Sequence, residues 1–447
     1  MKKKGLLVII FLTFFFFYPK AKAAEYTIIS NNSEQTVNDL NNLGVTVNSH
    51  IAEIGYIEAQ GDVNIDQIKK LSNIKSIQNM ADTSQNITTR VPSTYINQTI
   101  QLPQLFSYQW DMQKITNNGV SYSLNKENRK NVTVALVDSG IDVDHNAFTG
   151  MIDSRSKNFV PAGGYDNSES SETGSINDID DKKGHGTAVA GQIAANGQIF
   201  GVSPGTNLLV YRVFGKSKSK ECWILKAIID ATNNGANVIN LSLGQYIKIP
   251  NGDIWESAEA LGYKFAIDYA TRHNVIVVAA TGNDGLSDDN GEVKTYYNSQ
   301  HSGQDMSQND TVEDYPSVLP NAIAVGSSDN NNQRSSFSNY YNQYQDNFIL
   351  APGGGTTLLD QYGQEEWYNQ KLFMKEQVLS TSNNGNYDYA DGTSISTGKV
   401  SGELAEIISN YHLQGDSSKA RSILLNQVNY TSDGYKEIST YKALRGY

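Results

Sequence analysis

VTVALVDSGID, residues 132–142, is the stretch that decides the fold, because an almost unbroken apolar run ends there on Asp138 and a Ser-Gly turn. Further apolar runs and amphipathic helical patterns follow along the chain. The runs lie at 207–213, 236–243 and 275–280, and the helical patterns at 188–195, 222–233, 258–272 and 400–411. Strands that are apolar on both faces are typical of a parallel sheet covered by helices on both sides. The sequence therefore predicts an α/β fold with helices packed over a parallel sheet.

Residues 24–80 form a separate, smaller unit in the sequence pattern. Short strand-like and helix-like segments alternate there in the order βαββαβ, which predicts a compact ferredoxin-like module. Residues 81–103 are rich in Thr, Ser, Asn and Gln and include two prolines, a composition typical of a linker. We therefore predict a domain boundary within 81–103 and a larger domain at 104–447.

The first 23 residues have the features of a secretion signal. Three lysines at 2–4 precede an apolar stretch at 6–18, and Ala-Lys-Ala at 21–23 fits the small-x-small cleavage pattern. The apolar stretch is shorter than the about 20 residues that span a bilayer, which favours a cleaved signal peptide over the alternative of an uncleaved anchor. A secreted mature protein without membrane attachment is expected.

Composition excludes two classes of function. The net charge of −12 argues against a nucleic-acid-binding surface, which needs clustered Lys and Arg. The single cysteine, Cys222, rules out an intramolecular disulfide and a thiolate metal site, and its apolar surroundings predict a buried side chain.

Four polar residues stand where predicted elements begin or end. Asp138 closes the first strand, and Asn283 lies in a glycine-rich turn after the strand at 275–280. His185, in Gly-His-Gly-Thr, and Ser394, in Gly-Thr-Ser, each directly precede a predicted helix. Taken singly, each motif also fits an ordinary turn or helix cap. Together they supply a nucleophile, a base, a carboxylate that orients the base and a donor to the oxyanion.

These four motifs, in this order along the chain, resemble those of the subtilisin-like serine proteases. The resemblance implies a three-layer α/β fold in which Ser394 attacks the peptide carbonyl, His185 transfers the proton and Asp138 orients His185. It assigns Asn283 to the oxyanion. It also implies that the 24–80 module is an inhibitory propeptide and folding chaperone, and that the enzyme is a monomer.

The same resemblance indicates where the substrate binds. Ser242, Leu243 and Gly244 match the segment that pairs with the substrate backbone, although an ordinary strand end is the alternative. Asp284 falls where the family lines its P1 pocket, and a carboxylate there favours Arg or Lys. A self-processing site with the same preference is expected after Arg90, before Val91, in the linker.

The other acids of the 284–314 insertion are expected to belong to a solvated polar loop. They are Asp288, Asp289, Glu292, Asp305, Asp310, Glu313 and Asp314.

The chain departs from the family pattern in two places. Residues 395–400 read Ile-Ser-Thr-Gly-Lys-Val where Met-Ala-Ala-Pro-His-Val is common, and the missing proline predicts a less rigid helix start. The calcium loop is shortened at 195–199 and Ala147 replaces an aspartate ligand, so the high-affinity Ca²⁺ site is expected to be absent and no cofactor is required. Asp178, Asp180 and Asp181 are expected to form a solvated acidic loop, with a weakly held ion as the alternative.

Within the family, the chain is similar to the lantibiotic leader peptidases of the epidermin and nisin type. The similarity lies in the lysine-rich signal, the abundance of Asn and Tyr, the Trp-Asp-Met motif at 110–112 and the acidic P1 wall. It implies cleavage of one lantibiotic precursor outside a Gram-positive cell. A broad-specificity extracellular protease and a catalytically silent binding or chaperone module are the alternatives.

Overall fold

The computed structural model describes residues 23–80, 105–216, 218–288, 291–301, 306–342 and 345–446. All but the last residue of the predicted signal peptide lie outside the described residues, as does the predicted processing site at Arg90 and Val91. No helix in the described ranges is both long and apolar enough to cross a membrane.

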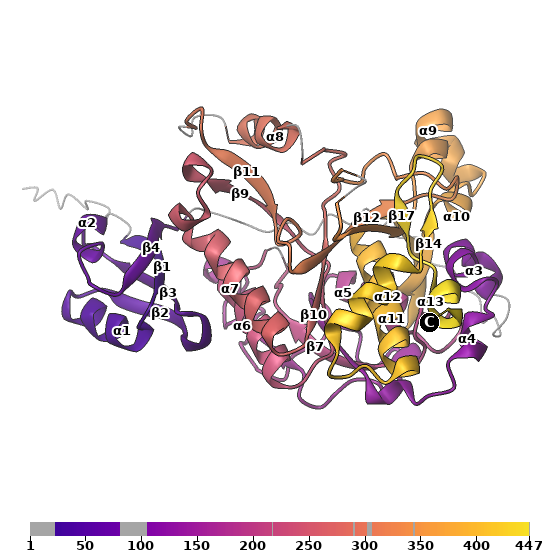
Figure 1. Ribbon diagram of the computed structural model, residues 1–447, viewed down its shortest axis with the longest axis horizontal. Coiled ribbons are helices and arrows are strands. Elements are labelled where there is room, and N and C mark those ends of the chain that lie inside the picture. Colours follow the sequence, from indigo (N-terminus) through magenta and orange to yellow (C-terminus); the bar gives the residue numbers. More distant parts are fainter. Residues whose placement is uncertain are drawn as a thin grey trace, which may run out of the picture.

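A central sheet organises the larger domain (Figure 1). Within the described residues its strand order is β16-β17-β13-β12-β10-β8-β5-β7-β6. The strands are β5 (Thr133–Asp138), β6 (Lys157–Asn158), β7 (Asn207–Arg212), β8 (Val238–Leu241), β10 (Ile276–Ala280), β12 (Ala322–Ser328), β13 (Phe348–Pro352), β16 (Asn429–Tyr430) and β17 (Lys436–Glu437). All neighbours are parallel except β16 and β17. The predicted parallel sheet is confirmed.

Alternating residues of the strands enter two different cores. Val134 and Leu136 pack with helices α5 (His185–Ala194), α11 (Thr393–Tyr411) and α12 (Ser417–Asn426). Ala135 and Val137 face the other side, against α6 (Glu221–Asn233) and α7 (Ala258–Arg272). Because successive side chains of a strand point to opposite faces, a run apolar at every position buries both faces of the sheet. Smaller helices α3 (Trp110–Thr116), α4 (Ser121–Leu124) and α13 (Thr440–Arg445) adjoin the α11 side.

Two helices begin earlier than the sequence pattern predicts. The predicted helix at 188–195 begins at His185, and the predicted helix at 400–411 begins at Thr393. Gly, Ser and Thr have low helix propensity, so the sequence pattern does not predict a helix in these first turns. Every residue of α11 from 393 to 409 is buried, so tertiary packing stabilises the segment.

The 284–314 insertion is not the simple polar loop that was predicted. It contains α8 (Glu292–Gln300) and β11 (Thr311–Tyr315), which pairs antiparallel with β9 (Gln245–Ile249). Val293, Tyr297 and Val312 form a small core between these elements. A second ribbon, β14 (Val378–Ser382) with β15 (Asn386–Ala390), follows α9 (Thr357–Asn369) and α10 (Phe373–Glu376).

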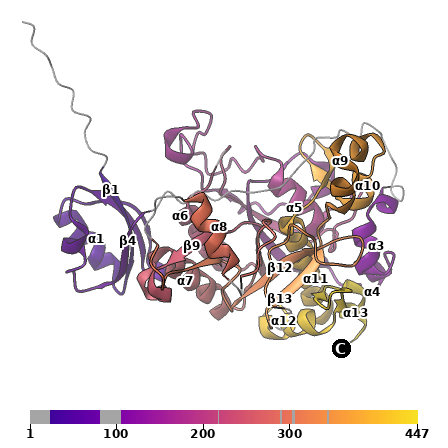
Figure 2. The ribbon, with the colours of Figure 1, turned by 90° about the horizontal axis from the view of Figure 1, so that it is seen from above.

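The N-terminal module has its own sheet, with the strand order β2-β3-β1-β4, and its own apolar core. Its elements are β1 (Ala24–Ser30), α1 (Ser33–Asn42), β2 (Thr46–Ile51), β3 (Tyr56–Gly61), α2 (Ile65–Ile68) and β4 (Ile74–Asn79). The sheet lies against α6 and α7 of the larger domain (Figures 1 and 2). There the Tyr56 hydroxyl contacts Glu221 at 3.4 Å, and Gln78 Oε1 accepts a 2.8 Å hydrogen bond from the Ala258 N–H, near the start of α7.

Candidate active site

Asp138 and His185 are in direct contact at the carboxyl edge of the sheet. Asp138 ends β5 and His185 begins α5, and their Oδ1 and Nδ1 atoms are 2.6 Å apart, with both side chains buried. The Ser139 N–H also donates to this carboxylate, at 2.7 Å. With Nδ1–H directed at a carboxylate, Nε2 carries the lone pair, and no described residue hydrogen-bonds to it. The imidazole is therefore oriented to accept a proton through Nε2.

Asp181 accepts hydrogen bonds from residues that flank this pair in the sequence, a role that the sequence pattern does not indicate. Its carboxylate accepts hydrogen bonds from Ser139 Oγ at 2.8 Å and from the N–H and hydroxyl of Thr187 at 2.9 and 2.7 Å. It also accepts from the N–H of Gly184 at 2.8 Å, at the positive start of α5. The prediction of a solvated acidic loop is wrong for Asp181, which is buried. The N–H groups at the start of α5 have no acceptor within the helix, and the carboxylate supplies one.

Positions 147 and 195–199, which correspond to the calcium-binding positions of the family, carry no acidic side chain. Ala147 is buried, and its carbonyl accepts a hydrogen bond from the Asn196 N–H at 3.0 Å. Asp178 instead pairs with Lys182 at 3.3 Å. In the part of the chain that the structure describes, no three His, Cys, Asp or Glu side chains are grouped so that they could hold a metal ion.

Ser394 is the second residue of α11 and lies against the end of β8. Its hydroxyl donates to the Ser242 carbonyl at 3.2 Å, and the Ser242 hydroxyl donates to the Ser394 carbonyl at 2.8 Å. Helices α5 and α11 pack together, and Ala188 and Ile395 share one apolar cluster. The structure thus brings the Ser394 helix against the His185 helix, with the serine hydroxyl turned toward Ser242 and not bonded to His185 Nε2.

Asn283 follows β10 and lies beside the turn that leads to Ser394. Its Oδ1 atom accepts hydrogen bonds from the Thr393 N–H at 2.9 Å and from the Thr393 hydroxyl at 3.1 Å. A methyl group placed on Gly392 would lie 3.5 Å from Asn283 Nδ2. Both amide atoms of Asn283 therefore lie at the Gly392–Ser394 turn, with Oδ1 accepting from Thr393 and Nδ2 as the donor atom of the side chain. The start of α11 adds backbone N–H groups that have no partner within the helix.

Asp314 is a buried acid, contrary to the prediction of a solvated loop. The residue is only 4% exposed. A methyl group on Gly244 would come within 2.9 Å of Asp314 Oδ1, and one on Gly282 within 3.2 Å of Oδ2. The carboxylate therefore lies between the 242–244 segment and the turn that carries Asn283. Burial raises the pKa of Asp314 well above its usual range, and the charges of Asp288 and Asp284 add to this rise.

Asp284 accepts a hydrogen bond from Tyr246, a residue that lies opposite Asp314 in the pairing of β9 with β11. The Tyr246 hydroxyl donates to Asp284 Oδ2 at 2.7 Å. Asn339 donates to the same hydroxyl at 2.7 Å and accepts from the Asp284 N–H at 3.1 Å. We call Asp284, Asp314 and Tyr246 the acidic cluster. Burial and the two carboxylates raise the pKa of Tyr246, which keeps its hydroxyl protonated as a donor.

Comparisons with known sequences agree with this geometry. A sequence model of the subtilase family, peptidase S8, matches residues 129–440. The nisin leader peptide-processing serine protease NisP of Lactococcus lactis subsp. lactis is 42% identical over 72% of this chain and 46% of its own length, so the match spans less than half of that protein. The epidermin leader peptide-processing serine protease EpiP of Staphylococcus epidermidis is 43% identical over 71% of this chain and 68% of its own length.

Solved structures give the same result. The crystal structure of EpiP from Staphylococcus aureus has a TM-score of 0.84 and 35% identity, covering 95% of this chain and 98% of that one. NisP from Lactococcus lactis has a TM-score of 0.71 and 39% identity, covering 76% of this chain and 94% of that one. The family match extends over most of the larger domain and the site residues lie within it. The chain belongs to the subtilase family of serine proteases.

Proposed function

We propose that this serine protease is an exported leader peptidase, made as a pre-pro-enzyme, that cleaves a lantibiotic precursor after Arg or Lys. The observation that carries the substrate class is the Asp314 carboxylate, enclosed between Gly244 and Gly282 and close to Asp284. The printed names of NisP and EpiP, which process the leaders of nisin and epidermin, support the choice of substrate.

In the proposed reaction, Ser394 Oγ attacks the scissile carbonyl and His185 Nε2 takes its proton. The serine side chain first rotates from the Ser242 carbonyl, to which it donates at 3.2 Å, toward His185. The Asp138 carboxylate stabilises the imidazolium that forms, and the proton then passes to the leaving amine. The negative oxygen of the tetrahedral intermediate accepts hydrogen bonds from the Ser394 N–H and from Asn283 Nδ2. Water hydrolyses the acyl-enzyme by the same steps.

The acidic cluster sets the P1 preference in this proposal. Glycine at 244 and 282 leaves no side chain between the substrate-binding segments and the carboxylate below them. A cationic P1 side chain that enters between the two segments meets Asp314, with Asp284 close by. A neutral P1 side chain leaves the buried carboxylate uncompensated, so the site favours Arg or Lys.

The N-terminal module acts in this proposal as the inhibitory propeptide, released after cleavage between Arg90 and Val91. Its contacts with the starts of α6 and α7, through Tyr56 and Gln78, support the proposal that the module binds the protease domain of its own chain. The basic residue at Arg90 matches the P1 preference that the acidic cluster predicts.

Peptide cleavage by the purified protein tests the proposal. Quenched peptides that differ only at P1, with Arg, Lys, Leu or Phe, are compared with casein, and Ser394→Ala is the inactive control. We expect cleavage after Arg and Lys and little digestion of casein. Equal or better cleavage after Leu or Phe would indicate a broad-specificity protease. Failure of a fluorophosphonate to label Ser394 would overturn the assignment of the nucleophile.

A further inference from the structure

Two sequence features that the proposed reaction does not use meet in the structure. One is Trp110-Asp111, at the start of α3, and the other is Lys399, in the first turns of the α11 helix that carries Ser394. Lys399 Nζ lies 3.0 Å from Asp111 Oδ2, and neither side chain is exposed. In the described ranges neither charged group hydrogen-bonds to any other residue. The two buried charges therefore depend on each other.

This pairing restricts where α3 can lie. A buried charge is tolerated only when an opposite charge compensates it at close range. Burial lowers the pKa of Lys399, and the Asp111 carboxylate opposes this. Any shift of α11 along α3 would separate the pair and leave both charges buried without compensation. The ion pair thus opposes sliding of the first turns of α11 along α3. The proline that is usual in the family is missing from these turns.

Trp110, the neighbour of Asp111, packs against an apolar cluster to which both α5 and α11 contribute a residue. Its indole packs on the cluster of Ala188, Val378, Ala390 and Ile395. Ile395 directly follows Ser394, and Ala188 is one turn along α5 from His185. The indole Nε1–H donates to the Gln377 carbonyl at 2.8 Å, and Gln377 contacts Asp391, just before the Gly392–Ser394 turn, at 3.4 Å.

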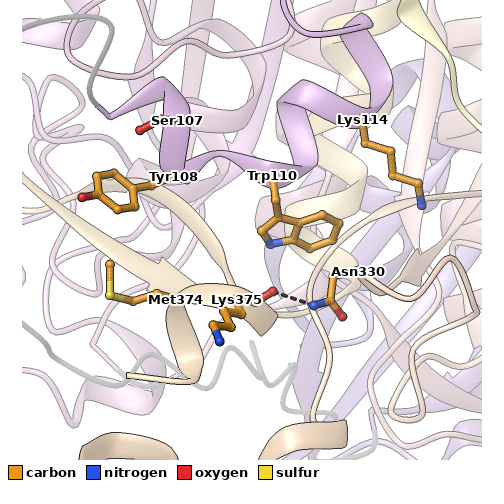
Figure 3. Close-up of a pocket in the computed structure, with 7 residues that line it drawn as sticks. All are labelled: Ser107, Tyr108, Trp110, Lys114, Asn330, Met374 and Lys375. Carbon is orange, nitrogen blue, oxygen red and sulfur yellow. Dashed lines mark hydrogen bonds between the residues drawn. The ribbon is translucent and has the colours of Figure 1, made fainter. Parts of the chain in front are cut away.

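Figure 3 shows how the indole is placed. It points from α3 into a pocket of about 550 Å³ that it lines together with Tyr108, Met374 and Lys375. The ring is held by its apolar cluster, by its hydrogen bond to Gln377 and by the adjacent ion pair.

We infer that Asp111 and Lys399 are positioning residues, which hold α3 against the first turns of α11 and so keep Ser394 aligned with His185. The inference rests on the proposed roles of Ser394 and His185. Neither Asp111 nor Lys399 touches the reacting atoms in this account. Their effect on catalysis passes through the start of α11 and through Trp110.

The test separates positioning from simple stabilisation. Enzyme matured from the full chain is compared as wild type, Asp111→Asn and the double variant Asp111→Leu with Lys399→Met. Glu406→Gln is the matched control, because Glu406 is also a buried acid of α11 and pairs with Arg129, three turns beyond Ser394. Each variant is assayed below its Tm for kcat and KM on one peptide, and for the rate of fluorophosphonate labelling at Ser394.

We expect Asp111→Asn to lower kcat and the labelling rate at least tenfold, with KM changed less than twofold. Glu406→Gln should lower Tm but leave kcat within twofold of the wild type. The double variant, which buries no charge, should recover most of the Tm and keep kcat at least fivefold below the wild type. It also keeps the test valid if Asp111→Asn does not fold.

Two results would overturn the positioning role. One is an unchanged kcat in folded Asp111→Asn, and the other is recovery of kcat together with Tm in the double variant, which would mean that the pair acts through stability alone. A wild type that is not labelled at Ser394 would instead overturn the proposed function. The two failures are therefore distinguishable.

Discussion

Asp314 lies directly beneath Gly244, so close that a methyl group on the glycine would come within 2.9 Å of the carboxylate. The two residues belong to different elements, β11 and the segment after β8, and they are 70 positions apart in the sequence. A side chain at 244 would occupy the space next to this carboxylate, and glycine leaves that space free. This relationship makes Asp314 the first residue to test for substrate choice.

Asp314→Asn should change the P1 preference. We expect kcat/KM for an Arg peptide to fall at least about 30-fold, equivalent to ~2 kcal/mol, the lower end for removing one partner of a buried charge pair. The value for the matched Leu peptide should stay level or rise, because the neutral site no longer carries an unpaired charge. Asp284→Asn is the control and should have a smaller effect, since Asp284 is less buried and already accepts from Tyr246. An unchanged Arg-to-Leu ratio in Asp314→Asn would refute this role.

The Arg-to-Leu ratio should also depend on pH. Burial and the charges of Asp288 and Asp284 raise the pKa of Asp314, while its hydrogen bond from Asn339 lowers it. The free site is therefore protonated at low pH, and a P1 cation binds better as rising pH ionises it. Effects of pH that act on both peptides alike cancel in the ratio. We expect the ratio to rise with pH in the wild type and to be flat in Asp314→Asn, measured as kcat/KM from pH 5 to 9.

Asn283 can be tested with a pair of substitutions. Asn283→Ala should lower kcat by about 10²–10³-fold, the range known for removing an oxyanion donor from a subtilisin, with little change in KM. Asn283→Asp keeps an oxygen to accept from Thr393 but loses the donor. It should therefore be equally slow while retaining more of the wild-type Tm than Asn283→Ala. Normal turnover by Asn283→Asp would show that the amide N–H is not needed.

Glu403 on α11 should make stability depend on pH. Burial raises the pKa of Glu403 to about 8, although Thr440 donates to it at 2.7 Å. Between its ordinary pKa and about 8, the folded protein holds a proton that the unfolded chain has lost, so stability falls as pH rises. The expected slope is about 1.4 kcal/mol per pH unit. Urea unfolding of Glu403→Gln should lack this component between pH 5 and 8, and an identical slope in the variant would contradict the assignment.

Release of the N-terminal module should be favoured at higher pH. Burial, with the nearby charges of Glu259 and Glu58, raises the pKa of Glu221, and the Tyr56 hydrogen bond partly opposes this. If the module leaves, Glu221 gains solvent and loses the charge of Glu58, so its pKa falls. Binding of the module therefore takes up a proton and weakens as pH rises. Size-exclusion chromatography of processed protein should show more bound module at pH 5 than at pH 8. Glu221→Gln should reduce this difference, and equal retention in the wild type at both pH values would contradict it.

The sequence by itself determined four strands of the central sheet (β5, β7, β8 and β10), the helices α5, α6, α7 and α11 that cover it, and the four motifs of the site, because these features depend on local order. A short run that is apolar at every position and rich in Val and Ile favours a strand buried on both faces, and a polar residue at its end lies at the sheet edge with the ends of its parallel neighbours. The position of Asp138 at the site therefore follows from the sequence, whereas its 2.6 Å contact with His185 is a result of the tertiary structure. The starts of α5 and α11 were missed because their Gly, Ser and Thr residues are helical only through tertiary packing.

Only the tertiary structure decided which polar residues are buried and with what partner. Asp181, Asp314 and the pair of Asp111 with Lys399 look like surface residues in the sequence, since a charged side chain is normally solvated. Each is buried because a group distant in the chain compensates it or encloses it: Ser139 for Asp181, two glycine segments for Asp314, and a lysine 288 positions away for Asp111. Such compensation depends on how the segments pack in three dimensions, which no local pattern encodes.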